Sequence, residues 1–185
     1  MNWHLGQNPV KAIGWGSRQR RITGDQYDFF SVEYVYGNGM RAHCAARQIN
    51  GCSNLKLEQI NGTNGFADCS GKLYNLQGEN IWKYPYPEEG NADSKWKVNN
   101  PFVQEHVNLI TAIRRGESVN DAETQANSTL ITIMGRMSAY TGKDVTWEEV
   151  MNSDLYLGPK VHAFGPVPEI IPENIPMAGI ENTVI

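Results

Sequence analysis

Apolar residues recur at helical spacing between residues 100 and 154, and this stretch predicts three helices in succession. The first begins with Asn100 as an N-cap and Pro101 at the first helical position, where a missing N–H has no cost. Gly116 ends it. Its apolar stripe is formed by Val103, Val107, Leu109, Ile110 and Ile113.

The second helix is predicted to run from Asn120 or Asp121 to Gly142, and the spacing of Asn120 and Glu123 suggests a capping box. A helix of this length can cross a whole sheet. The predicted buried face consists of Ala122, Ala126, Leu130, Ile133, Met134 and Met137. The side chains small enough for close packing are those of Ala126, Ser128, Gly135 and Ser138.

A short third helix follows, opened by a second capping box. Thr146 and Glu149 have the required spacing, and Trp147 and Val150 fall on the inner side. These three helices form a block with short connections.

Upstream of this block, short runs rich in β-branched and aromatic residues are separated by turn signals, which predicts a series of strands. Tight turns such as Gly37-Asn38-Gly39 favour hairpins, so we expect an antiparallel meander. Strands followed by helices are typical of an α+β fold, here an open, mostly antiparallel β-sheet with helices packed on one face. The predicted strands are Val10–Trp15, Tyr27–Tyr36, Met40–Ile49, Asn54–Ile60, Gly65–Cys69, Lys72–Leu76 and Asn80–Tyr84.

We expect one domain over residues 1–157, in which residues 1–6 are the end of a preceding helix. Pro85–Val98 is predicted to be a polar loop that holds Trp96 against the sheet. Residues 158–185 carry five of the nine prolines and predict an extended arm. The arm has apolar residues that need a surface, in this chain or another subunit, namely Ile170, Ile171, Ile175 and Ile180.

A chain of 185 residues suits a single domain of ordinary size. The net charge of −4 does not indicate a positively charged surface that would bind nucleic acid, and no apolar run has the length of a membrane span. Cys44, Cys52 and Cys69 include no C-x-x-C pair, so we expect reduced core thiols and no metal site. The first residues do not form a signal peptide, which makes the cytoplasm the expected location unless a signal precedes Met1.

Two polar clusters are candidates for chemistry, although no self-contained catalytic motif is present. The loop that contains Arg18, Arg21, Tyr27 and Asp28 could grip sugar hydroxyls or an anionic group, while spacing alone favours a solvated charged loop. In the strand over residues 40–49, alternation puts the apolar side chains on one face. The opposite face carries Arg41, His43 and Arg47, which could line a cleft or pair with a partner subunit.

Several blocks of the sequence together resemble a known family. The blocks NPVKAIGW, RQINGC, NPFVQEHVNLITAIRRGE, GRMSAYTGK and VTWEEV occur in an order that is similar to the C-terminal domain of Gfo/Idh/MocA-family oxidoreductases. The resemblance covers nearly all of residues 1–159. It implies a domain that completes the substrate pocket beside an N-terminal Rossmann domain that binds NAD or NADP, with subunit contacts on the open sheet face.

In that family the glycine-rich cofactor loop, the lysine of a Glu-Lys-Pro motif and a His-x-x-Asp pair lie upstream of the residues that resemble residues 1–6. The resemblance therefore implies that Met1 is internal to a longer protein and that this chain alone is catalytically silent. It assigns no catalytic, cofactor-binding or metal-binding residue here. As substrate-side contacts it suggests Arg18, Arg21, Tyr27, Asp28, His43 and Arg47.

Three functions are consistent with this resemblance. The first is the substrate-binding and oligomerisation domain of an NAD(P)-dependent oxidoreductase that acts on a sugar, polyol or related carbohydrate, with a homo-oligomer formed through the open sheet face. The second is the corresponding part of an NAD-dependent glycoside hydrolase similar to α-N-acetylgalactosaminidases. The third is a non-catalytic assembly or binding module.

Overall fold

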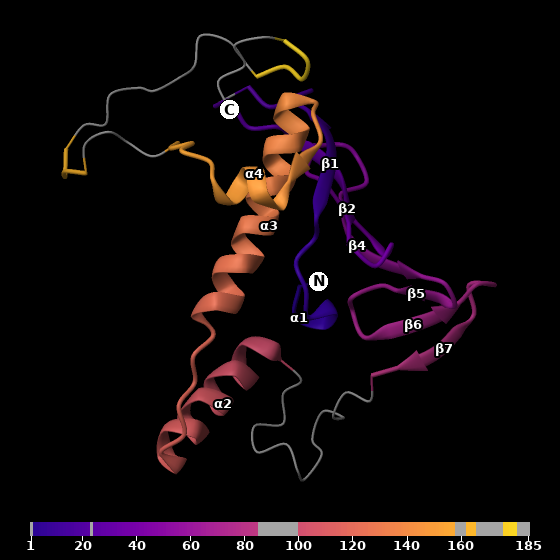
Figure 1. The fold of residues 1–185 in the computed structure, drawn as a ribbon, viewed down its shortest axis with the longest axis vertical. Helices are drawn as coiled ribbons and strands as arrows, with labels where there is room; N and C mark the ends of the chain where they lie inside the picture. The colour runs from indigo at the N-terminus through magenta and orange to yellow at the C-terminus, as the bar shows by residue number, and fades with distance from the viewer. Residues whose placement is uncertain (1, 23, 85–99, 158–161, 166–175, 181–185) are drawn as a thin grey trace.

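The chain folds around one open sheet of eight strands (Figure 1). The computed structural model describes residues 2–22, 24–84, 100–157, 162–165 and 176–180. The sheet order is β7-β6-β5-β4-β3-β2-β1-β8, and every neighbouring pair is antiparallel, which confirms the predicted fold class. The strands are β1 (Lys11–Ser17), β2 (Phe29–Val35), β3 (Arg41–Arg47), β4 (Leu55–Gly62), β5 (Gly65–Ala67), β6 (Lys72–Asn75), β7 (Asn80–Lys83) and β8 (Val145–Thr146).

The helices are α1 (Asn2–Leu5), α2 (Pro101–Arg115), α3 (Ala122–Thr141) and α4 (Trp147–Met151). The long helix α3 packs on the face of the sheet formed by β1 and β2, and α4 packs against α3 and β8. Within the described ranges no helix covers the opposite face, which we call the open face. Helix α2 stands apart from the sheet in Figure 1. Three residues of its predicted apolar stripe, Leu109, Ile110 and Ile113, are therefore exposed.

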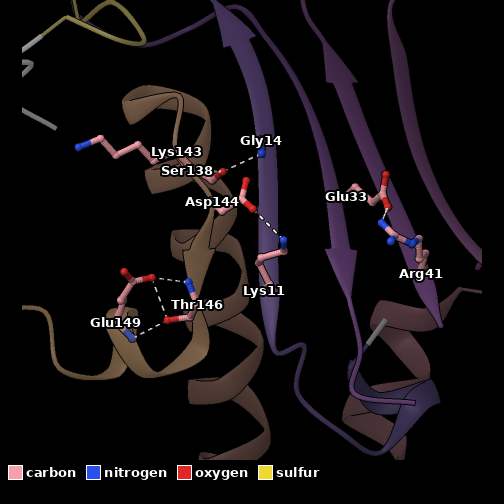
Figure 2. A network of polar contacts seen from close by, with 9 residues as sticks. All are labelled: Lys11, Gly14, Glu33, Arg41, Ser138, Lys143, Asp144, Thr146 and Glu149. Carbon is pink, nitrogen blue, oxygen red and sulfur yellow. Dashed lines mark hydrogen bonds and ion pairs between the residues drawn. The ribbon is translucent and has the colours of Figure 1, made fainter. Parts of the chain in front are cut away.

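The core lies between α3 and the sheet, where small residues allow close approach. A Cβ atom on Gly14 of β1 would lie 2.6 Å from the backbone nitrogen of Ala139, so only glycine fits there. The N–H of Gly14 donates to the Ser138 hydroxyl at 2.7 Å (Figure 2). The buried core cluster consists of Ala12, Val32, Tyr34, Tyr36, Ala42, Ile131, Met134, Val145 and Val150.

The predicted buried face of α3 is only partly right. Met134 is fully buried and Leu130 and Met137 are partly buried, whereas Ala122, Ala126 and Ile133 are exposed. The helix crosses the sheet with its C-terminal half, and its N-terminal half extends beyond β1 and β2 (Figure 1). The observed buried residues are Ile131, Met134, Gly135, Ser138, Ala139 and Tyr140.

Most predicted helix ends are confirmed. The Asn100 side chain accepts from the N–H of Phe102, and Gly116 and Gly142 end α2 and α3 in the left-handed conformation. The predicted capping box at Asn120 is wrong, because Asp121 is the N-cap and makes no side-chain capping bond. The Asn120 side chain instead accepts from the nearby N–H of Ala122 at 3.2 Å.

The capping box of α4 is confirmed (Figure 2). The Thr146 hydroxyl accepts from the N–H of Glu149 at 3.2 Å, and the Glu149 carboxylate accepts from the N–H of Thr146 at 2.6 Å. Val150 is buried and Trp147 packs against the core, as predicted.

Part of the predicted C-terminal arm packs on the same domain. Pro176 is buried, its carbonyl accepts from the Tyr27 hydroxyl at 2.9 Å, and the N–H of Gly179 donates to the carbonyl of Thr141 at 3.1 Å. The loop at 85–98 with Trp96, and the predicted contacts of Ile170, Ile171 and Ile175, lie outside the described residues.

The cysteines Cys44, Cys52 and Cys69 form no disulfide. Cys44 and Cys69 are half-buried, but Cys52 is exposed, so the prediction of core thiols is wrong at that position because its turn lies on the surface. None of the helices described has the length and apolar character needed to span a bilayer.

Candidate functional site

The loop after β1 and the turn after β3 meet at one end of the sheet and enclose a hollow of about 380 Å³. We call it the loop pocket. The N–H of Gln48 donates to the carbonyl of Asp28 at 2.9 Å, which joins the two segments. The lining residues are Arg20, Arg21, Asp28, Gln48, Ile49 and Asn50.

Asp28 is buried and anchors the loop. Its carboxylate accepts from the backbone N–H groups of Gln19 at 3.0 Å, Arg20 at 2.7 Å and Arg21 at 3.1 Å. The bond from the Arg20 N–H is the main cause that lowers the pKa of Asp28, and it outweighs the opposing effect of burial. Asp28 therefore stays ionised at neutral pH and fixes the loop backbone.

Arg18 and Tyr27 are also engaged within the protein. Arg18 donates through Nε to the carbonyl of Arg21 at 2.5 Å and through Nη1 to the carbonyl of Gly24 at 2.6 Å. The Tyr27 ring stacks on Tyr140 with centroids 4.0 Å apart, and burial raises the pKa of its hydroxyl. Both side chains thus determine the shape of the loop.

Arg20 and Arg21 supply the cationic lining of the pocket. Nη1 of Arg20 donates to the carbonyl of Asn50 at 3.2 Å, which ties the loop to the turn. Nε of Arg21 is buried and has no hydrogen-bond partner among the residues that the structure describes. Arg21 therefore has one buried donor that the described residues leave unsatisfied.

His43 and Arg47 lie on the open face of β3, as alternation predicted. Arg47 donates through Nε to the carbonyl of Ser53 at 2.9 Å, and its strand partner is Phe29, next to the loop pocket. Nε2 of His43 lies 3.3 Å from the Ser31 hydroxyl. His43 and Arg47 are four residues apart on β3, which corresponds to roughly 13 Å along the strand. The structure thus brings Arg18, Arg21, Tyr27, Asp28 and Arg47 to one end of the sheet, and it leaves His43 away from them.

A larger cleft of about 560 Å³ lies on the other face of the sheet, beside α3. We call it the α3 cleft. Its lining includes Phe30 and Tyr34 of β2, Glu58 of β4 and Arg136 of α3, which are far apart in the sequence. This cleft could not be predicted from the sequence pattern, in which the one available signal is a lone arginine within the apolar run LITIMGRM. Cys44 also lines it, and burial raises the pKa of that thiol to about 12, so it stays protonated at neutral pH.

No three His, Cys, Asp or Glu side chains gather into a metal-binding group within the described ranges. The described strands are joined only in antiparallel pairs, so they contain no βαβ unit whose glycine-rich turn could hold a dinucleotide. The described residues therefore include no Rossmann-type dinucleotide site.

Comparisons with family models and with curated proteins gave no match. Solved structures that are similar in fold include the following two. A candidate myo-inositol dehydrogenase from Sinorhizobium meliloti 1021 shares 14% identity at a TM-score of 0.51, over 78% of this chain and 45% of that chain. GenD2 from gentamicin A biosynthesis, solved in complex with NAD, shares 18% identity at a TM-score of 0.52, over 78% of this chain and 44% of its own.

The chain thus spans less than half the length of each of these proteins. Because the sequence identity is so low, the similarity to these two structures establishes the fold alone. The fold expected from the sequence resemblance is confirmed: this chain has an open antiparallel sheet with a helix layer, and most of it aligns with part of the candidate myo-inositol dehydrogenase and with part of GenD2.

Proposed function

We propose that this chain is the substrate-binding and oligomerisation domain of an NAD(P)-dependent oxidoreductase that acts in the cytoplasm on a sugar, polyol or related carbohydrate. The observation that carries the proposal is the shared fold with a candidate myo-inositol dehydrogenase and with GenD2, which was solved with NAD. The match covers most of this chain and less than half of each of those proteins.

In this proposal the loop pocket is the substrate side of the domain. Arg20 and Arg21 add positive charge to the lining and Asp28 adds an ionised carboxylate, a combination that suits the oxygens and hydroxyl groups of a carbohydrate. Arg18, Tyr27 and Arg47 hold backbone carbonyls and act as positioning residues. His43 contributes to the open face instead.

NAD or NADP would supply hydride transfer from a separate dinucleotide-binding domain, because the described strands include no Rossmann-type βαβ unit. This chain would bind and orient the substrate. Calorimetry of the chain with NAD and NADP should detect no micromolar binding, whereas saturation-transfer NMR with a panel of neutral sugars, polyols and sugar acids should detect at least one ligand. Micromolar cofactor binding, or a panel without any ligand, would contradict the proposal.

A role in assembly is favoured by the open face. Trp15 of β1 is 53% exposed and Leu55 of β4 is 52% exposed, and alternation directs both away from α3. Apolar side chains exposed on an uncovered sheet face favour association. We propose that a second copy of the chain packs there.

Sedimentation velocity tests this role in assembly. The wild-type chain should sediment as a dimer or larger, and Trp15→Glu should shift it to monomer. Trp3→Glu is the matched control, because Trp3 is 79% exposed on α1, and α1 contacts α3, which packs on the other face of the sheet. A monomeric wild-type chain, or an unchanged oligomer in Trp15→Glu, would remove the open face as the interface.

A further inference from the structure

We infer that the α3 cleft binds a small organic carboxylate with an apolar body, and that Arg136 holds its carboxylate group. No residue lines both this cleft and the loop pocket. The inference therefore does not depend on the proposed function.

The cleft has the size and walls of a small-molecule site. Its volume of about 560 Å³ lies within the usual range of roughly 300–1,000 Å³ for such sites. Phe30, Val32 and Tyr34 of β2 form one wall and Ile131 of α3 contributes to another. These aromatic and aliphatic surfaces would cover the apolar body of a ligand.

Arg136 provides the polar anchor. Its guanidinium lies over the ring of Tyr140 at 4.3 Å from the centroid, and the Tyr140 ring stacks in turn on Tyr27. Nη1 of Arg136 is buried and finds no hydrogen-bond partner in the described part of the chain. A buried charged donor without an acceptor is unfavourable. Because this nitrogen is buried, a ligand reaches it only when the Arg136 side chain shifts, and the bond then formed satisfies a donor that the described residues leave unpaired.

The charges at the cleft favour an anion. Lys56 and Arg136 line it together with the single carboxylate of Glu58, and none of the ion pairs of the described residues joins Arg136 to Glu58. A carboxylate can accept two parallel bonds from the planar guanidinium, which a neutral hydroxyl cannot. An uncharged apolar molecule would leave the Arg136 donor unsatisfied.

Benzoate is the probe for this site, with neutral benzamide of the same shape as its matched partner. Calorimetry on the full chain should show that benzoate binds at least about tenfold more tightly than benzamide. Arg136→Gln should weaken benzoate binding by about the same factor and leave benzamide nearly unchanged. Arg114→Gln, on the exposed surface of α2, is the control and should change neither.

Two further measurements keep the test decisive if Arg136→Gln fails to fold. Glu58→Gln removes the opposing charge and should tighten benzoate binding by a factor of about two or more. Amide NMR shifts on benzoate addition should concentrate at Ile131, Thr132 and Phe30. Any one of three results would overturn the inference. The first is equal affinity for benzoate and benzamide, and the second is unchanged benzoate binding in Glu58→Gln or in folded Arg136→Gln. The third is a set of amide shifts confined to other elements.

Discussion

Gly14 shows how one residue positions the helix layer. The N–H of Gly14 points to the side of β1 that faces away from β2. On that side β8 pairs only with Lys11 and Ala12, so the N–H of Gly14 donates to the Ser138 hydroxyl of α3 instead, at 2.7 Å. The Ser138 hydroxyl in turn donates to the carbonyl of Lys143 at 2.6 Å. The missing side chain and the extra hydrogen bond thus fix α3 at the same point of the sheet.

Gly14→Ala should destabilise the chain by at least about 2 kcal/mol. The new methyl group would meet backbone atoms of Ala139 and Gly135, at 2.6 and 2.8 Å, and these cannot swing aside as a side chain can. Urea unfolding measures the free energy of unfolding. Gly37→Ala is the control, because its methyl would lie 3.7 Å from Val10, an ordinary contact. Equal stability of both variants would show that α3 does not pack this closely.

Asp28 should titrate below its ordinary pKa of about 3.9. Because the folded pKa lies below the unfolded one, its contribution to stability is complete above that ordinary value and disappears as pH falls through the folded pKa. A pH titration of amide proton shifts should show Gln19, Arg20 and Arg21 changing together. The N–H of Gln77 bonds to the uncharged side chain of Asn75 and should stay constant. A midpoint at or above the ordinary value would show that the carboxylate is not bonded as described.

At the scale of elements, local signals predicted the helices and strands well. Helix ends depend on residues that bond to neighbouring backbone groups, so the sequence alone is enough to locate these ends. Examples are Asn100, Gly116, Gly142 and the Thr146 capping box. The buried face of α3 could not be predicted in the same way. Gly135 and Ser138 were predicted as close-packing positions and are confirmed as buried, but the complete buried face depends on which strands lie beneath the helix and includes Ala139 and Tyr140, which the hydrophobic pattern did not indicate.

The capping box predicts a measurable cost for α4. Thr146→Ala should lower the free energy of unfolding by about 1 kcal/mol, because the N–H of Glu149 loses its side-chain acceptor. Hydrogen exchange of the α4 amides should accelerate in this variant. Thr129→Ala, on the exposed side of α3, should change neither quantity noticeably. If both variants behave alike, the capping box does not stabilise α4.

At the scale of the whole molecule, the two pockets differ in how far the sequence could predict them. Arg20, Arg21 and Asp28 belong to one short segment, so the sequence could place them near one another, whereas strand pairing brings the turn at Gln48–Asn50 beside them. The α3 cleft unites Phe30, Glu58 and Arg136, which only the order of strands and the crossing of α3 bring together. The sequence correctly placed His43 on the polar face of its strand, but the resemblance suggested it as a substrate-side contact together with the loop residues, and its position along β3 keeps it away from them.

Protein-observed NMR tests the central claim, that this chain is the substrate side of a carbohydrate oxidoreductase, most directly. The amide spectrum of the chain is recorded with the carbohydrate panel, and separately with NAD. We expect at least one carbohydrate to shift the amides of Arg20, Arg21 and Gln48, and to bind more weakly to Arg21→Gln. Arg41→Gln is the control and should bind it unchanged, because Arg41 pairs with Glu33 on the open face (Figure 2). NAD should leave the spectrum unchanged. Shifts caused by micromolar NAD, or a loop pocket that responds to no carbohydrate at millimolar concentration, would contradict the account.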